Sequence, residues 1–183
     1  MVSHGKKVEN AISLLKDDHK KVKKLFDEFK NAGRRQTKKK IVEQTLMELR
    51  VHAAIEEEIF YPAVRKHVGK DLMNEADEEH HVAKVLVAEL TKMDGSEDHY
   101  DAKFTVLAEN VRHHIKEEET EMLPKARAMQ IDFDALGVEM LRRKKQLMDT
   151  GVSPGGEDAM VAASHGMGDS PAKAAQATTG KIG

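Results

Sequence analysis

The sequence contains no cysteine and no tryptophan, only four prolines, and few aromatic residues: five phenylalanines and two tyrosines among 183 residues. Without cysteine, the chain can form no disulfide framework, thiolate metal site, iron–sulfur cluster or cysteine nucleophile. Any metal site must therefore use nitrogen and oxygen ligands. The sequence also lacks an apolar run of about 18 residues, the length that a membrane-spanning helix requires.

The charges nearly cancel. Lysine and arginine supply 30 residues against 32 aspartates and glutamates, for a formal net charge of −2, so the chain has no electrostatic basis for binding nucleic acid. The first ten residues lack the apolar core of a signal peptide. The sequence contains no glycine-rich phosphate loop, nucleophile elbow or dinucleotide fingerprint. We therefore expect a cytoplasmic protein with no nucleic-acid or membrane partner.

Glycine divides the chain into helical segments and a tail. Five of the twelve glycines precede residue 150, and the segments between them repeat apolar residues at three- and four-residue spacing. This pattern predicts helices over 8–31, 38–67, 71–93, 98–129 and 133–149. Four long helices with short loops favour an all-α, antiparallel up-and-down four-helix bundle over 1–150, with a short fifth helix on its outside. Residues 151–183 are rich in glycine, alanine, serine and threonine, and we expect a disordered tail there.

An internal duplication relates the two halves of the bundle. The motif His-x3-Glu-Glu-x4-Pro occurs at His52–Pro62 and again at His114–Pro124, an offset of 62 residues. The preceding helices match too, because Asp18-His19 corresponds to Glu79-His80 at an offset of 61. Each half therefore carries a histidine followed, one helix later, by a His-x3-Glu pair.

Helical periodicity places six polar side chains on the apolar stripes that face the bundle interior. They are His19, His52, Glu56, His80, His114 and Glu118. Burying an unpaired carboxylate costs several kcal/mol, so the two glutamates require positive partners. No lysine or arginine interrupts the stripes around these positions. A pair of divalent or trivalent cations would satisfy all six groups; the alternative is a metal-free polar layer in an interaction module.

Ligand chemistry narrows the choice of metal. Imidazoles and carboxylates inside a four-helix bundle suit iron or manganese, and the His-x3-Glu step puts both groups on one helix face. Two carboxylates can bridge ions about 3.5–4 Å apart. The duplication leads to the hypothesis that His19 and His52 bind one ion, His80 and His114 bind the other, and both glutamates bridge.

These residues and the Glu-Glu-x4-Pro endings resemble the bacterial hemerythrin-like, HHE cation-binding domain. The resemblance covers roughly residues 8–149. It implies an antiparallel four-helix bundle that holds a non-haem, oxo-bridged centre of two iron ions, with manganese or zinc as alternatives. In oxygen-carrying hemerythrins, O2 binds at an open iron position.

The sequence departs from the oxygen carriers at two positions. The carriers place a second histidine four residues after the first on the third helix, where this chain has Lys84. Their fourth-helix carboxylate commonly lies one position later, which would make Glu119 the ligand instead of Glu118. The missing imidazole leaves a more open site. Two hypotheses follow: a protein that binds O2 or senses or reacts with small oxidants, and a di-iron enzyme that decomposes peroxide or oxidises and stores iron.

Several neighbours of the six positions are alternatives or supporting residues. His81 is an alternative to His80, although the helical phase favours His80. Glu57 and Glu119 could each hold a ligating histidine in one tautomer, or could be simple surface carboxylates. Tyr61 is within reach of the site, but we expect it to pack at the end of the bundle.

Overall fold

The computed structural model describes residues 10–152, and every regular element in that range is helical. The elements, with η denoting a π-helical turn, are α1 (Ala11–Asn31), α2 (Arg35–Ile55), η1 (Glu56–Phe60), α3 (Tyr61–Val68), α4 (Lys70–Lys92), α5 (Tyr100–Glu117), η2 (Glu118–Met122), α6 (Leu123–Arg127) and α7 (Phe133–Thr150). No helix of residues 10–152 is long and apolar enough to cross a membrane. The tail predicted over 151–183, apart from its first two residues, lies outside the described residues, as does the predicted helix start at residue 8.

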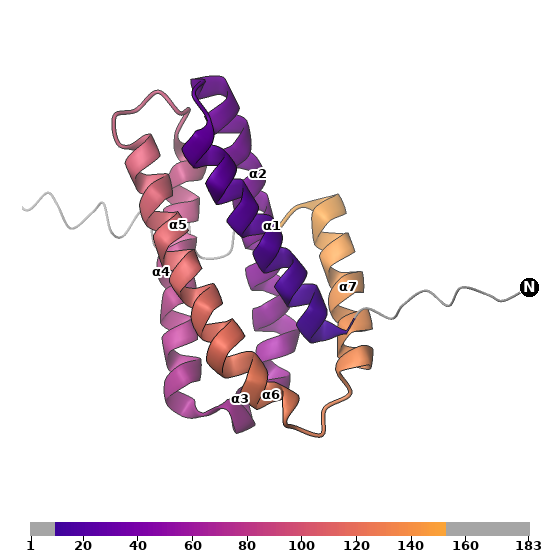
Figure 1. The fold of residues 1–183 in the computed structure, drawn as a ribbon. Helices are drawn as coiled ribbons and strands as arrows, with labels where there is room; N and C mark the ends of the chain where they lie inside the picture. The colour runs from indigo at the N-terminus through magenta and orange to yellow at the C-terminus, as the bar shows by residue number, and fades with distance from the viewer. Residues whose placement is uncertain (1–9, 153–183) are drawn as a thin grey trace, which may run out of the picture.

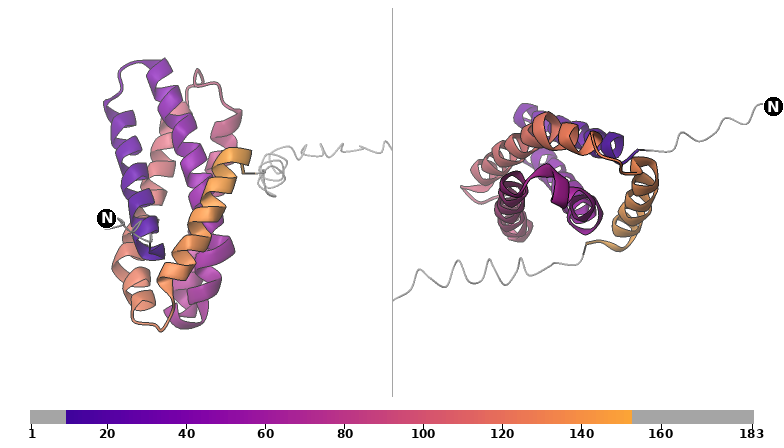
Figure 2. Two further views of the ribbon diagram at one scale, coloured as in Figure 1. Left: turned by 90° about the vertical axis from the view of Figure 1, so that its right-hand side faces the viewer. Right: turned by 90° about the horizontal axis from the view of Figure 1, so that it is seen from below.

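The helices form the predicted antiparallel four-helix bundle (Figure 1). Helices α1 and α2 form one hairpin, and α4 and α5 form the second. The bundle closes because α2 also packs against α4, and α1 against α5. Figure 2 shows α7 on the outside, where it packs against α1 and α2. The fifth helix thus covers one hairpin and leaves the other uncovered.

Local sequence signals set several helix ends. The Asn10 side chain accepts a hydrogen bond from the backbone N–H of Ile12 (3.0 Å), and Asp132 accepts one from that of Ala135 (2.9 Å). Each therefore caps a helix N-terminus. Gly69 alone separates α3 from α4 and has φ 113°, a left-handed value that favours glycine.

The helices predicted over 38–67 and 98–129 are each interrupted by a turn of π-helix, so the expectation of regular α-helix is wrong at these two places. In a π turn a backbone N–H donates to the carbonyl five residues earlier, as Tyr61 does to Glu56. Such turns are uncommon and are frequent at functional sites. Both of them begin at a glutamate predicted to be a ligand.

A proline follows each π turn and explains why the turn forms. Pro62 and Pro124 lie inside otherwise continuous helical segments. In a regular α-helix, proline cannot donate to the carbonyl four residues earlier, and its ring clashes with that carbonyl. A wider turn relieves this clash. The repeated Glu-Glu-x4-Pro motif is therefore the sequence signal for both π turns.

A polar layer divides the buried core into two apolar clusters. One cluster includes Ile12, Leu15, Val51, Ile55, Phe60, Val64, Met122 and Met140, and extends to α7. The other includes Val22, Phe26, Phe29, Leu49, Val87, Phe104, Leu107 and Val111. Burying each large apolar side chain stabilises the fold by about 1.5–3 kcal/mol. Because both clusters pack tightly, they hold the layer between them at a fixed height in the bundle.

Candidate metal centre

The six residues predicted to be ligands lie together in the polar layer, and none has more than 7% of its surface exposed. We call His19, His52, Glu56, His80, His114 and Glu118 the inner cluster. The helices α1, α2, α4 and α5 each contribute one histidine, and each π turn contributes its first residue. The structure places His80 here and leaves His81 exposed; it likewise places Glu118, and not Glu119, inside.

The inner cluster contains two groups of converging ligand atoms. One group is His19, His52, Glu56 and Glu118; the other is Glu56, His80 and His114, and within each group the ligand atoms lie within 4.8 Å of one another. The Glu56 carboxylate belongs to both groups. Its Oε1 lies 3.2 Å from His52 Nε2, and its Oε2 lies 3.4 Å from His80 Nε2.

Glu118 occupies the matching place on the opposite side. Its Oε2 lies 3.2 Å from His19 Nε2 and 3.8 Å from His114 Nε2. Each glutamate therefore faces one histidine from each half of the chain. This arrangement can hold two cations, with two imidazoles on each and a carboxylate between them.

The inner atoms are poorly satisfied by the protein alone. Within residues 10–152, no hydrogen-bond partner exists for Nε2 of His19 and His52, for either carboxylate oxygen of Glu56, or for Oε2 of Glu118. Buried polar atoms almost always have a partner, and leaving one unpaired costs about 1–3 kcal/mol. Converging imidazole nitrogens and carboxylate oxygens that lack hydrogen-bond partners fit a bound metal ion.

A second layer of carboxylates lies behind the four histidines. We call these residues the outer carboxylates; their distances to the facing Nδ1 atoms are 3.0 Å for Glu119 and His19, 3.5 Å for Asp18 and His52, 2.8 Å for Glu57 and His80, and 2.8 Å for Glu79 and His114. Asp18 and His52 form an ion pair at the longer distance. The three glutamates lie within hydrogen-bond distance of Nδ1, and a carboxylate that accepts from Nδ1–H fixes the tautomer in which Nε2 is free to bind a metal. The sequence offered Glu57 and Glu119 for this role. The sequence analysis assigned no role to Asp18 or Glu79, although each directly precedes a histidine in the duplicated pairs Asp18-His19 and Glu79-His80.

Lysines contact three of the outer carboxylates. The contacts are Lys84 Nζ to Glu57 Oε2 (2.5 Å), Lys23 Nζ to Glu119 Oε1 (3.2 Å) and Lys144 to Asp18. Lys23 and Lys84 each follow an inner histidine by four residues, so the duplication extends to this layer. In place of an additional imidazole ligand, position 84 therefore supplies a cation to an outer carboxylate.

Carboxylates raise the pKa of two inner histidines, His52 and His80, in the metal-free protein. Burial alone lowers the pKa of His52, but Glu56 and Asp18 outweigh it and raise that pKa to about 10. Burial likewise opposes protonation of His80, whose pKa Glu56 and Glu57 raise to about 9. Burial would raise the pKa of Glu56, yet the two histidines hold it well below its usual range. Metal binding must displace the protons on these imidazoles.

Tyr61 lies in the centre, so the expectation that it packs at the bundle end is wrong. Its hydroxyl donates to Glu118 Oε1 (3.2 Å) and lies 3.2 Å from His80 Nε2 and 3.4 Å from His114 Nε2. Burial and the Glu118 carboxylate raise the pKa of the phenol well above its usual value, so it stays protonated. The π turn explains the error, because it changes the helical phase and brings Tyr61 onto the face of Glu56.

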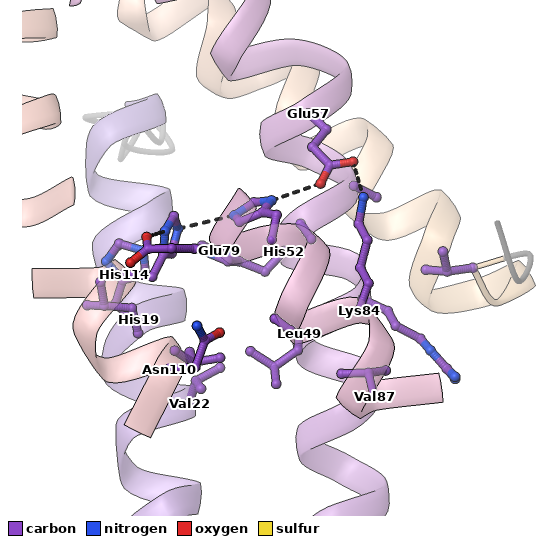
Figure 3. Close-up of a pocket in the computed structure, with 18 of the residues that line it drawn as sticks. His19, Val22, Leu49, His52, Glu57, Glu79, Lys84, Val87, Asn110 and His114 are labelled. Atoms are coloured by element: carbon purple, nitrogen blue, oxygen red, sulfur yellow. Dashed lines mark hydrogen bonds and ion pairs between the residues drawn. The ribbon is translucent and has the colours of Figure 1, made fainter. Parts of the chain in front are cut away.

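A cavity of about 230 Å³ adjoins the inner cluster (Figure 3). Its apolar walls include Val22, Leu49, Ala83, Val87, Val111 and Ile115. In Figure 3, Val22, Leu49 and Asn110 lie together below the labelled histidines. The cavity gives a small molecule room beside the ligand atoms.

Comparison with known proteins agrees with this geometry. The sequence matches the family described as "Hemerythrin HHE cation binding domain" over residues 10–126. It is similar to the solved structure of a hemerythrin HHE cation binding domain-containing protein from Mycobacterium kansasii, with a TM-score of 0.65 and 25% identity. That similarity covers 79% of this chain and 96% of the other.

Two curated relatives are similar to the same part of the chain. An uncharacterized hemerythrin-like protein of Schizosaccharomyces pombe is 26% identical over 110 residues, which are 58% of this chain and 54% of the relative. A protein of Nostoc sp. named DNA nickase is 29% identical over 111 residues, 61% of this chain and 32% of the relative. The chain thus spans about a third of one relative and about half of the other.

Proposed function

This chain belongs to the hemerythrin HHE cation binding family, and from that membership and the inner cluster we propose that it is a di-iron protein that binds O2 or reacts with another small oxidant. The observation that carries the proposal is the set of buried Nε2 and carboxylate atoms that converge without hydrogen-bond partners among residues 10–152. Nitrogen and oxygen donors of this kind suit iron, and manganese or zinc would use the same atoms.

The residues have distinct roles in the proposed centre. His19 and His52 would hold one ion, His80 and His114 the other, and Glu56 would bridge them, with Glu118 facing both pairs. The outer carboxylates orient the imidazoles through Nδ1. When bound, iron would supply redox chemistry, and the adjoining cavity gives a small molecule room beside it.

A second candidate function is turnover of peroxide, and Tyr61 favours it. The Tyr61 hydroxyl lies 3.2 Å from His80 Nε2 and is placed to donate a hydrogen bond or a proton to a ligand held beside it. The equivalent position in the other half is Leu123, which has no proton to donate. An oxidant held near His80 and His114 therefore has an acid beside it.

Metal analysis and optical spectroscopy test the main proposal. Protein made with abundant iron should hold about two iron ions per chain and show near-ultraviolet bands typical of oxo-bridged iron. The matched control is His81→Ala, which removes an exposed histidine next to an inner one and should leave the iron content unchanged. Fewer than about one ion per chain in a folded protein contradicts a dinuclear site.

Oxygen measurements separate the two candidates. A carrier or sensor forms a stable adduct that is lost when O2 is removed, whereas an enzyme evolves oxygen from peroxide over many cycles. Reversible adduct formation without turnover contradicts the enzymatic alternative. Continuous oxygen evolution at a rate that follows the iron content supports it.

A further inference from the structure

A second His-x3-Glu pair lies on α5, one residue before the inner pair. His113 and Glu117 immediately precede His114 and Glu118, so they point to a neighbouring face of the same helix. His113 Nε2 lies 3.2 Å from Glu117 Oε1 and 3.5 Å from Glu79 Oε1 on α4. One ligand atom from each residue lies within 4.8 Å of the others, an arrangement that can hold a cation.

The duplication shows that this face differs from its counterpart. The positions 62 residues earlier are Val51 and Ile55, which are fully buried in the apolar cluster that extends to α7. The helix α7 covers the first hairpin only, as Figure 2 shows. His113 is 58% exposed, so its face is open to ions in solution.

Glu79 links this exposed group to the inner cluster. Its Oε2 lies 2.8 Å from His114 Nδ1, while its Oε1 faces His113. Figure 3 shows Glu79 beside His114. Glu79 can therefore bind an exposed cation through Oε1 and, at the same time, orient His114 through Oε2.

The charges of the outer carboxylates supply an independent argument. Three of them pair with a lysine, as described above, but Glu79 does not: among residues 10–152 its ion-pair partners are His113 and His114. The ion-pair partner of Glu117 in that range is His113. Glu79 and Glu117 thus share one exposed imidazole. Each of the other three outer carboxylates pairs with a lysine.

We propose that Glu79, His113 and Glu117 form a third cation site, exposed at the surface, that binds a divalent transition-metal ion of the Zn²⁺ class. One imidazole and two carboxylates match the nitrogen and oxygen donors that such ions accept, and water completes the coordination. The bound ion takes the place that lysine occupies at the other outer carboxylates. This surface site has no ligand in common with the inner cluster. The two are connected through Glu79, which also supports His114.

Zinc titration of the iron-loaded, full-length protein tests the proposal. We expect about one Zn²⁺ per chain beyond the buried ions, removable by brief treatment with a chelator, and a loss of affinity of at least about tenfold in Glu117→Gln. A second variant, His113→Lys, separates loss of the ligand from loss of charge, because it keeps a cation beside Glu79 but removes the imidazole. It should abolish Zn²⁺ binding and leave the iron content unchanged.

The variant in which His52 and Glu56 are both leucine separates this site from the buried centre. It should lose the buried ions and still bind Zn²⁺ at the surface. In the wild type, failure of iron to bind while Zn²⁺ still binds at the surface would contradict the proposed di-iron function and leave the third site standing. Absence of additional Zn²⁺ in the wild type, or equal Zn²⁺ binding in His113→Lys, would overturn the third site.

Discussion

Tyr61 and Leu123 occupy equivalent positions 62 residues apart, yet only Tyr61 places a hydroxyl among the inner histidines. The duplication relates the two halves of the centre at every residue of the inner cluster, but the two halves differ at this position. The Tyr61 hydroxyl therefore lies beside His80 and His114, and the equivalent Leu123 side chain has no hydroxyl to offer.

Replacing Tyr61 with phenylalanine should slow peroxide turnover by the iron-loaded protein by about 100-fold, because it removes the acid beside the reacting ligand. The change deletes one oxygen atom, so the iron content should stay close to that of the wild type. Oxygen evolution from peroxide measures the effect. The control is Tyr100→Phe, in a tyrosine that is equally buried but belongs to the distant apolar cluster. Equal turnover in both variants would contradict the role of Tyr61.

Replacing His52 and Glu56 together with leucine should stabilise the metal-free protein, by about 1–4 kcal/mol, since a buried charged pair gives way to apolar packing. With iron bound, the wild type should be the more stable of the two proteins, because only the wild type gains free energy of binding. Denaturant unfolding with and without iron measures both effects. An equal gain from iron in the two proteins would place the binding site elsewhere.

The metal-free protein should lose stability as the pH rises from about 6.5 to about 10. The pKa of His52 and His80, raised in the fold to about 10 and about 9, means that folding favours the protonated imidazoles. This contribution is fully present below the unfolded pKa of 6.5 and is lost as the pH rises through the folded values. Urea unfolding across this range measures it, with the double leucine variant as the control.

Iron binding should show the opposite dependence on pH. Because the imidazoles must lose protons before they bind a metal, the apparent affinity should rise with pH over the same interval. Proton release into a weakly buffered solution during iron addition measures the displacement directly. Binding without proton release would show that the imidazoles are already neutral in the metal-free protein.

Replacing Lys144 with alanine should destabilise the fold by about 1–3 kcal/mol, because the largely buried Asp18 loses one of its two charged partners, the other being His52. Unfolding in urea measures the loss. Lys145→Ala is the matched control, since the neighbouring side chain is exposed and should contribute within about 0.5 kcal/mol. Iron affinity should also fall in Lys144→Ala alone, because Asp18 supports His52.

Much of this fold follows from periodicity. The alternation of three- and four-residue steps predicted the helices and placed the inner residues on the bundle interior, because a stripe of that period has only one face that can be buried. The duplication then predicted that two histidines from each half would lie close together. The structure brings these same six residues into one buried cluster.

Other features depend on contacts that periodicity does not describe. Tyr61 was misplaced because a single π turn shifts the helical phase, and only the later proline signals that turn. The repeat included Asp18, but its contact with His52 depends on how α1 is rotated against α2. Lys144 is separated from Asp18 by 126 residues, and only the packing of α7 brings the two together.

The family match ends at residue 126, whereas α7 begins at Phe133. Helix α7 nevertheless contacts the centre from outside. Lys144 pairs with Asp18, the carboxylate behind His52, and Arg143 donates two hydrogen bonds to Glu58, two residues after Glu56. A boundary at residue 126 would therefore remove the lysine beside Asp18 and keep the lysines beside Glu57 and Glu119. We expect loss of α7 to affect the His52 side first, because Asp18 would lose its lysine partner.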